Sequence, residues 1–270
     1  MIDEAIQGYY DRGDERERLL GGGGTLELVR TKELLKRYLP EPPADVLDVG
    51  GGPGVYAGWL AGAGYRVHLV DPVALHVAQA KDAAGEQPDH PFTAAVGDAR
   101  RLGEADASYD AVLLLGPLYH LTERANRVGA LGEARRVLRP GGIVLAAAIS
   151  RFASLLDALS RAMLDDSEVR QVIERDVREG QHRNPAPERL PGWFTTAFFH
   201  LPEELAAEVA AAGFELEGVL GIEGPGGFAG DWDDAKQRAG IQTAAGWVER
   251  ERSLLGISPH LLAVGRRGGE

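Results

Sequence analysis

The sequence of 270 residues contains no cysteine and no long apolar run. Without cysteine the chain can form no disulfide, thiolate metal site or cysteine nucleophile, and this fits a reducing compartment. No apolar stretch approaches the ~18 residues that a membrane span needs. The N-terminal stretch is charged and unlike a signal peptide, so we expect a cytoplasmic protein without a membrane partner.

Positive charge is also scarce, with 29 Lys and Arg against 41 Asp and Glu and a net charge of -12. Nucleic-acid binding relies on Lys and Arg to neutralise phosphates, so this balance argues against a DNA or RNA partner. The sequence lacks a G-x-S-x-G elbow, a P-loop lysine and histidine pairs with metal-ligand spacing. These absences argue against serine hydrolases, nucleotide triphosphatases and metal sites, and favour a small-molecule substrate.

A glycine-rich turn, the stretch 45–54 with the sequence DVLDVGGGPG, organises the rest of the chain. Its short apolar run predicts a buried strand, and the four glycines within the next five residues predict a sharp turn. Apolar residues at helical spacing follow, so the turn should lie at a helix N-terminus. Free N–H groups there would face a cavity that a ligand can approach closely.

Two registers of the glycines point to different cofactors. The dinucleotide pattern G-x-G-x-x-G/A fits only late, with Gly52, Gly54 and Ala57, and leaves an NAD-dependent oxidoreductase as an alternative. The pattern D-x-G-x-G-x-G begins at Asp48 and continues with Gly50, Gly52 and Gly54, in step with the end of the strand. This second pattern resembles motif I of the class I S-adenosylmethionine (SAM) dependent methyltransferases.

Carboxylates follow the next two predicted strands. Asp71 and Pro72 end the strand over 65–70, and a carboxylate at that point can accept both hydroxyls of a ribose, in either cofactor class. Asp98 and Ala99 follow the strand over 92–96. In the methyltransferase reading, Asp98 takes the adenine amino group and the Ala99 N–H donates to a ring nitrogen.

Two further segments are typical of the same family: the strand over 109–115 with the loop after it, and an L-R-P-G-G turn before the strand over 143–149. Five such segments span about residues 45–150. The resemblance implies an α/β fold, a Rossmann-like seven-stranded and mostly parallel sheet with helices on both faces. It also implies that Leu115 and Gly116 pass close to SAM through their backbone.

The predicted organisation has four parts. Residues 1–40 form an N-terminal helical cap, with helices over 2–20 and 25–38 joined by a tetraglycine hinge at 21–24. Residues 41–150 form the SAM-binding core, and residues 151–192 form a helical substrate-pocket insertion after the fifth strand. Residues 193–270 complete the core, with strands over 214–222 and 259–264 as its antiparallel edge. The loop over 223–230 is either a mobile cover of the substrate or an ordinary surface loop.

The residues that face the acceptor are predicted from their places in the chain. They lie in the cap, after the fourth and fifth strands, and after the insertion. If the cap covers the cofactor, it brings Arg18 near the site. If the acceptor is a hydroxyl, a histidine is the natural base. The candidate substrate-binding residues are Tyr9, Tyr10, Tyr119 and Arg151, and the candidate bases are His120 and His200. The other histidines, among them His76 and His260, receive no role.

The sequence therefore predicts a SAM-dependent methyltransferase that acts on a small organic acceptor, such as a hydroxyl or acid of a metabolite or natural product. The donor is already activated, so the enzyme needs mainly to align the reacting atoms in a dry pocket, without a metal. An NAD-dependent oxidoreductase and a non-catalytic SAM-binding module remain the alternatives. No Y-x-x-x-K pair, which the oxidoreductase reading predicts, occurs.

Overall fold

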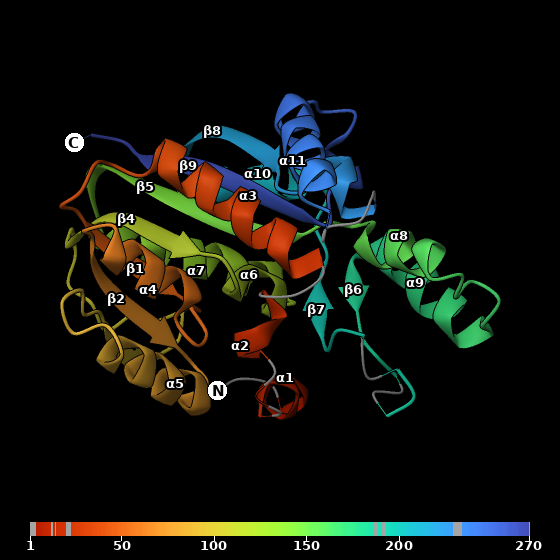
Figure 1. Cartoon of the computed structure of the whole chain (residues 1–270), viewed down its shortest axis with the longest axis horizontal. Coiled ribbons are helices and arrows are strands. Elements are labelled where there is room, and N and C mark those ends of the chain that lie inside the picture. The colour runs from red at the N-terminus through yellow and green to blue at the C-terminus, as the bar shows by residue number, and fades with distance from the viewer. Residues whose placement is uncertain are drawn as a thin grey trace.

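The computed structural model describes residues 4–11, 13, 15–19, 23–185, 188–190, 193–228 and 234–269. A twisted sheet forms the middle layer, and helices lie on both of its faces (Figure 1). Within these residues no helix is both long and apolar enough to cross a membrane.

The central sheet has seven strands in the order β3-β2-β1-β4-β5-β9-β8. They are β1 (Asp45–Val49), β2 (Arg66–Asp71), β3 (Thr93–Val96), β4 (Tyr109–Leu114), β5 (Leu138–Ile149), β8 (Phe214–Gly221) and β9 (His260–Arg267). The first five run parallel, whereas β9 is antiparallel to both of its neighbours. The predicted seven-stranded, mostly parallel sheet is confirmed.

Each face of the sheet has its own apolar core, because successive residues of a strand point to opposite faces. Val46 and Leu113 belong to one core, while Leu47 and Leu114 belong to the other. The first face is covered by α3 (Gly23–Tyr38), α4 (Val55–Gly62) and α5 (Ala74–Gly85), the second by α7 (Arg124–Val137) and α10 (Pro202–Ala211). Burial on both faces explains why the strands read as continuous apolar runs.

The N-terminal segment differs from the single helix predicted over residues 2–20. It forms two short helices, α1 (Glu4–Tyr10) and α2 (Glu15–Arg18). Gly13 lies between them with φ +82, a conformation that glycine adopts without a Cβ clash. Both helices lie below the carboxyl end of the sheet in Figure 1, near α5 and β7 (Ala197–Phe198).

The predicted tetraglycine hinge is only partly described. Gly21 and Gly22 lie outside the described residues, whereas Gly23 and Gly24 begin α3. A Cβ at Gly24 would lie 2.0 Å from the carbonyl oxygen of Arg18. This glycine therefore serves close packing between α2 and α3.

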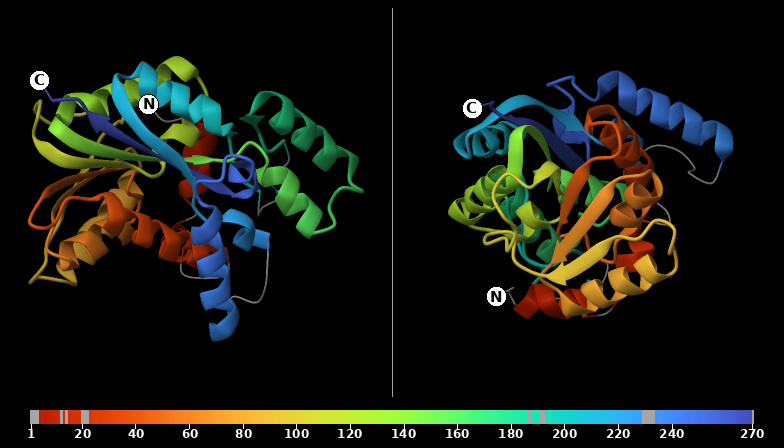
Figure 2. Two further views of the ribbon diagram at one scale, coloured as in Figure 1. Left: turned by 90° about the horizontal axis from the view of Figure 1, so that it is seen from above. Right: turned by 90° about the vertical axis from the view of Figure 1, so that its left-hand side faces the viewer.

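The segment after β5 forms a separate small unit. Helices α8 (Ala153–Ser160) and α9 (Ser167–Glu179) project from the end of the sheet (Figure 2), and β6 (Gln181–His182) pairs with β7 in a second, two-stranded sheet. Asp166 caps α9 by accepting from two backbone N–H groups, and Gly180 ends the helix with φ +73. The pair of helices packs on its own apolar cluster, separate from the two sheet cores.

The segment between β8 and β9 departs from the predicted mobile loop over 223–230. Glu223 is 3% exposed, and a 3-10 helix, η1 (Gly224–Phe228), follows it. Residues 229 and 230 of that loop, and Trp232 after it, lie outside the described residues. Helix α11 (Ala235–Val248) and η2 (Leu255–Ile257) were not predicted. Among the described residues, the buried Glu223 carboxylate is bound by Ser258 and His260, which no local pattern connects to it.

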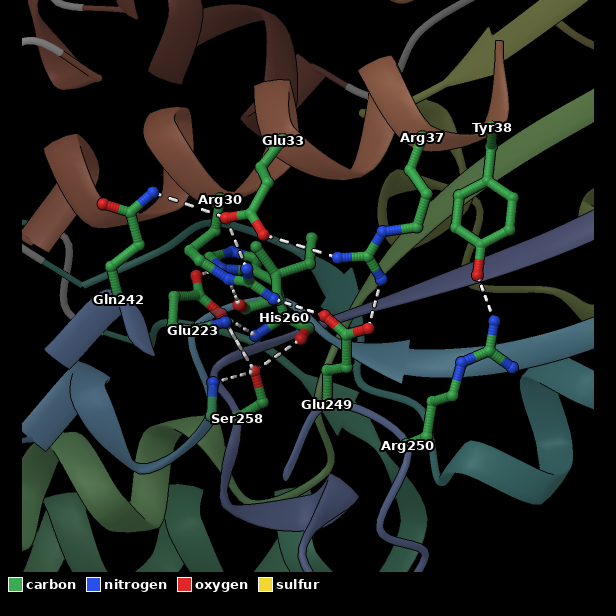
Figure 3. A network of polar contacts seen from close by, with 12 residues as sticks. Arg30, Glu33, Arg37, Tyr38, Glu223, Gln242, Glu249, Arg250, Ser258 and His260 are labelled. Carbon is green, nitrogen blue, oxygen red and sulfur yellow. Dashed lines mark hydrogen bonds and ion pairs between the residues drawn. The ribbon is translucent and has the colours of Figure 1, made fainter. Parts of the chain in front are cut away.

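A buried arginine ties α3 to this C-terminal segment (Figure 3). Arg30 is 0% exposed; its Nε donates to the Ile222 carbonyl over 3.0 Å and its Nη2 to Glu249 over 2.6 Å. Arg37, on the same helix, also pairs with Glu249, but its side chain is 40% exposed. The Glu249 carboxylate is therefore bound by one buried arginine, Arg30, and by one partly exposed arginine, Arg37.

We expect Arg30→Met to lower the free energy of unfolding by about 3 kcal/mol, because it removes one partner of a buried ion pair. Arg37→Met is the matched control and should cost less than about 1 kcal/mol, since exposed pairs contribute little. Urea unfolding followed by circular dichroism measures both variants. Equal losses would show that burial of Arg30 adds nothing to the pair.

Candidate active site

A cavity of about 380 Å³ lies at the carboxyl ends of the parallel strands. It is lined by the residues that follow β1, β2, β3 and β4. The strand order reverses between β1 and β4, and open α/β sheets bind ligands at such switch points. The described lining also includes residues of α1, α2 and α3, and none from the insertion 151–192.

The glycine turn forms the floor of this cavity. Gly50, Gly52 and Gly54 have φ of +70, +56 and +88, which favours glycine at all three positions. A Cβ at Gly50 would lie 2.7 Å from the ring of Pro117, whereas a Cβ at Gly52 would meet only the Glu15 side chain at 3.9 Å. Gly52 therefore faces open space in the cavity. Gly54 packs against Phe92 and lies outside the described lining.

The Asp71 carboxylate is oriented by this turn. Its Oδ2 accepts from the Gly52 N–H over 2.9 Å, and its Oδ1 accepts from the Val73 N–H over 2.8 Å. The Nδ1 of His76 lies 3.2 Å from the same Oδ1. Asp71 is 4% exposed and lines the cavity together with Pro72. A carboxylate oxygen has more than one lone pair, so both oxygens can accept a further bond from a ligand.

The loops after β3 and β4 complete this end of the cavity. Asp98 and Ala99 both line it. A hydrogen-bonded ion pair with Arg100 at 2.5 Å holds the pKa of Asp98 below its usual range, so Asp98 is ionised. After β4, Leu115 and Gly116 line the cavity, and a Cβ at Gly116 would lie 3.0 Å from the Gly50 carbonyl oxygen.

Asp48 is a buried carboxylate beneath the glycine turn. It is 0% exposed, and neither oxygen has a hydrogen-bond partner within the described part of the chain. Burial, helped by the nearby Asp71, raises the pKa of Asp48 to about 7. A Cβ on Gly51 would lie 2.6 Å from its Oδ2, so only glycine leaves room above it. Such an unpaired carboxylate is costly unless a ligand satisfies it.

Aromatic rings lie between α1 and the loop after β4. The Oη of Tyr10 lies 2.6 Å from the Nε2 of His120, which belongs to α6 (Pro117–His120). The Tyr10 ring packs edge-on against both His76 and His120. Burial lowers the pKa of His120 to about 4, so its imidazole is neutral at pH 7. Tyr10, Tyr119 and His120 line the cavity, whereas Tyr9 packs behind them against Phe194.

Besides Tyr9, two further predicted acceptor-side residues lie outside the described cavity lining. His200 is 0% exposed, and its Nε2 lies 3.3 Å from the Glu208 carboxylate of α10. Arg151 donates to the Phe199 carbonyl over 2.8 Å and to Glu204 over 2.6 Å. Both side chains lie outside the described cavity lining. The prediction that they face the acceptor is corrected: a bridge between Ser150 and His200 continues β5 and directs both toward α10.

The other end of the cavity contains charged residues, most of which had no predicted role. Arg18 of α2 binds both carboxylate oxygens of Glu27 of α3, at 2.7 and 3.1 Å. His260, the first residue of β9, lies beside this pair. Ile222 and Thr31 also line the cavity, and Glu15, which pairs with Arg18 over 2.7 Å, reaches the space above Gly52. These residues come together only in the folded chain, so no local pattern could reveal them; only Arg18 was anticipated, as part of the cap.

Residues 46–142 match the methyltransferase domain family. The chain is 34% identical to a ubiquinone biosynthesis O-methyltransferase of Methylocella silvestris over 43% of this chain and 44% of that protein. It is 28% identical to the ubiquinone/menaquinone biosynthesis C-methyltransferase UbiE of Caulobacter vibrioides, over 78% and 84% of the two chains. The first three curated relatives are matched over 44%, 60% and 61% of their own length.

Solved structures show the same fold. A SAM-dependent methyltransferase of Methanosarcina mazei superimposes with a TM-score of 0.60 and 18% identity, over 88% of this chain and 98% of that one. A methyltransferase of Haloferax volcanii, solved with its activator Trm112, gives 0.64 and 19%, over 98% of both chains. Residues 46–142 therefore form a methyltransferase domain, and the sheet has the fold of the class I SAM-dependent methyltransferases. The predicted resemblance to this family is confirmed, and SAM is the cofactor that it implies.

We expect Gly50→Ala to weaken SAM binding at least ~10-fold, because the new Cβ is strained at φ +70 and meets the Pro117 ring. Gly58→Ala on α4 is the matched control, since its Cβ would make only ordinary contacts from 3.6 Å outward. That variant should bind SAM within ~twofold of wild type, because alanine favours a helix. Isothermal titration calorimetry measures the affinities, and unchanged binding by Gly50→Ala contradicts the role of the turn.

Proposed function

We propose that this chain transfers the methyl group of SAM to a small organic acceptor that carries a hydroxyl or acid group. The observation that carries this proposal is a single cavity with two different ends. One end joins the glycine turn to Asp71 and Asp98, and the other holds polar side chains beneath α1 and α2. The names of the relatives, quinone biosynthesis O- and C-methyltransferases, support a small-molecule acceptor.

The residues at the first end fit SAM. Gly50 and Gly52 leave backbone room for the methionine part, and Asp71 with Pro72 offers two acceptor oxygens for the ribose hydroxyls. We assign the adenine to Asp98 and Ala99, beside the backbone of Leu115 and Gly116. The unpaired Asp48 carboxylate near this end is compatible with a cationic ligand.

Bound SAM supplies an electrophilic methyl group, so the chain's own task is alignment and exclusion of water. Tyr10 and Tyr119 line the cavity with aromatic rings, and the Tyr119 ring packs against His120. His120 stays neutral there and fixes the Tyr10 hydroxyl at 2.6 Å. We therefore propose that His120 positions Tyr10. We further propose that residues 1–40 act as a cap over the core 41–150, with 151–192 as an insertion and 193–270 completing the sheet.

Two measurements separate this proposal from its rivals. Calorimetry with SAM, S-adenosylhomocysteine and NAD should show binding of the first two compounds. Incubation with labelled SAM and a panel of hydroxylated acceptors should then release S-adenosylhomocysteine. Binding of SAM without transfer to any acceptor would favour a non-catalytic SAM-binding module, and binding of NAD alone would contradict the proposal.

Asp71→Ala should weaken SAM binding by about 1.5–3 kcal/mol, the cost of losing hydrogen bonds to a charged group. Asp82→Ala on α5 is the control, because Asp82 is exposed and lies outside the described cavity lining. Calorimetry gives both affinities, and thermal melting checks that the fold is kept. Wild-type affinity in Asp71→Ala would mean that the ribose is held by other groups.

A further inference from the structure

Three ionisable side chains meet at the acceptor end of the cavity. Glu27, Glu223 and His260 each direct one polar atom to within 4.8 Å of the others. They come from α3, from the residue before η1 and from the first residue of β9. Figure 3 shows His260 beside Glu223 and Ser258, in the same network of polar contacts as Arg30. In the sheet, His260 pairs with Ile149, the last residue of β5.

Glu223 is fixed by several donors. Its Oε1 lies 2.5 Å from the Nδ1 of His260, and its Oε2 accepts from the Ser258 hydroxyl and the His260 N–H, each at 3.0 Å. The Ser258 oxygen in turn accepts from the Glu223 and Gly224 N–H groups at 3.1 Å. This buried carboxylate therefore holds the imidazole in one orientation through its Nδ1.

Among the described residues, none forms a hydrogen bond with the other ring nitrogen of His260, Nε2, so this atom can take a ligand. The side chain is 22% exposed and lines the cavity, and Nδ1 is already bound to Glu223. Glu27 lies 4.0 Å from Nδ1, with both of its oxygens bound to Arg18. Glu223, Glu27 and Arg18 are thus the charged groups that surround the imidazole.

We propose that His260 is the catalytic residue that takes the proton of the methyl acceptor, and that the acceptor is a weakly acidic hydroxyl of phenol or enol type. This inference rests on the proposed function and names the substrate class of the same site. Glu223 and Glu27 are positioning residues, which hold the ring and its charge.

The electrostatics match the base to this class of acceptor. Burial alone lowers the pKa of His260, but the carboxylates of Glu223 and Glu27 outweigh burial and Arg18, and raise it to about 9. A phenol has a pKa of ~10, so the proton passes between groups of similar affinity. An aliphatic alcohol is far less acidic and would not release its proton to this base.

The transfer step balances without a further reactant. The acceptor O–H gives its proton to Nε2 of neutral His260, and the oxygen attacks the methyl carbon. The new C–O bond forms as the C–S bond breaks, and the electron pair of that bond stays on sulfur as a thioether. A phenolate that binds to the protonated histidine gives the same complex, so the mechanism operates from either starting state.

Two other interpretations of the site fit the contacts less well. His120 has a pKa of about 4 and is already bonded to Tyr10, so it holds a proton too weakly to remove one from a phenol. A metal ion in the cluster would have to displace Arg18 from Glu27 and a proton from His260. The contacts therefore favour a proton acceptor.

The substrate class is tested with three probes and labelled SAM. Catechol and 1,3-cyclohexanedione carry acidic hydroxyls or enols, whereas benzyl alcohol has an aromatic ring without an acidic hydroxyl. We expect methyl transfer to at least one of the acidic probes at a rate ~100-fold above that to benzyl alcohol. Equal rates, or transfer to amines and thiols alone, overturn the inference.

The role of His260 is tested by His260→Gln, with His90→Gln as the matched control at an exposed histidine outside the described lining. His260→Gln should lower kcat for the best probe ~100-fold or more and leave SAM affinity within ~twofold, because a general base acts on the acceptor alone. His90→Gln should leave both unchanged. Wild-type kcat in His260→Gln overturns the inference.

A pH profile separates catalysis from a structural role. His260 must be neutral to accept a proton, so kcat/KM should rise with pH through about 9. Removal of either carboxylate charge lowers the pKa of His260, so Glu223→Gln and Glu27→Gln should move this rise to lower pH. NMR titration of the His260 ring should show the same order. A shifted NMR pKa with an unshifted rate profile overturns the inference.

The test distinguishes the two levels of the proposal. Failure of the wild-type chain to bind SAM would defeat the proposed function. Normal SAM binding with no effect of His260→Gln would defeat only the assignment of the base. A rate that rises with added Mn²⁺, and loses that rise in Glu27→Gln, would show a metal site in place of the proton acceptor.

Discussion

The close approach of two loops, one after β1 and one after β4, is the constraint on which the site depends. A Cβ at Gly116 would lie 3.0 Å from the Gly50 carbonyl oxygen, and a Cβ at Gly50 would lie 2.7 Å from the Pro117 ring. The loops therefore meet backbone to backbone, which leaves the space above Gly52 open and its N–H bound to Asp71. Because backbone forms this wall, a single added methyl group disturbs it more than most changes on the surface.

The fold of the core could be predicted because its signals are local. Each parallel strand is buried on both faces, and the turns that end the strands contain glycine or aspartate at fixed places. Helix α11 gave no such signal: it has no continuous apolar stripe, and Trp247 near its end is 80% exposed. The strands β6 and β7 are two residues each, too short for any periodicity.

The residues of the cavity also differed in how well the sequence predicted them. The residues predicted for the cofactor end follow directly from strand ends, and apart from Gly54 they line the cavity. At the acceptor end the same logic failed for Arg151, which follows β5. That strand runs for 12 residues, and its end pairs with β9 at His260. The residue after β5, Arg151, therefore packs against α10. The side chain that lines the cavity beside this strand end is His260 of β9.

The charged groups that line the cavity bear on the proposed chemistry. The positive charge on a sulfonium fades as the methyl group leaves, so a carboxylate beside the sulfur would stabilise the ground state more than the transition state. Asp71 lies under the glycine turn, Arg18 with Glu27 lies beside His260, and Glu15 reaches from Arg18 to the space above Gly52. Asp48, with a pKa of about 7, is only partly ionised at neutral pH.

Neutral rings also line the cavity, because burial keeps His120 uncharged and raises the pKa of Tyr119. In the proposed reaction, His260 takes the proton of the acceptor oxygen. Its counter-ions are Glu223, which binds its Nδ1, and Glu27 of α3.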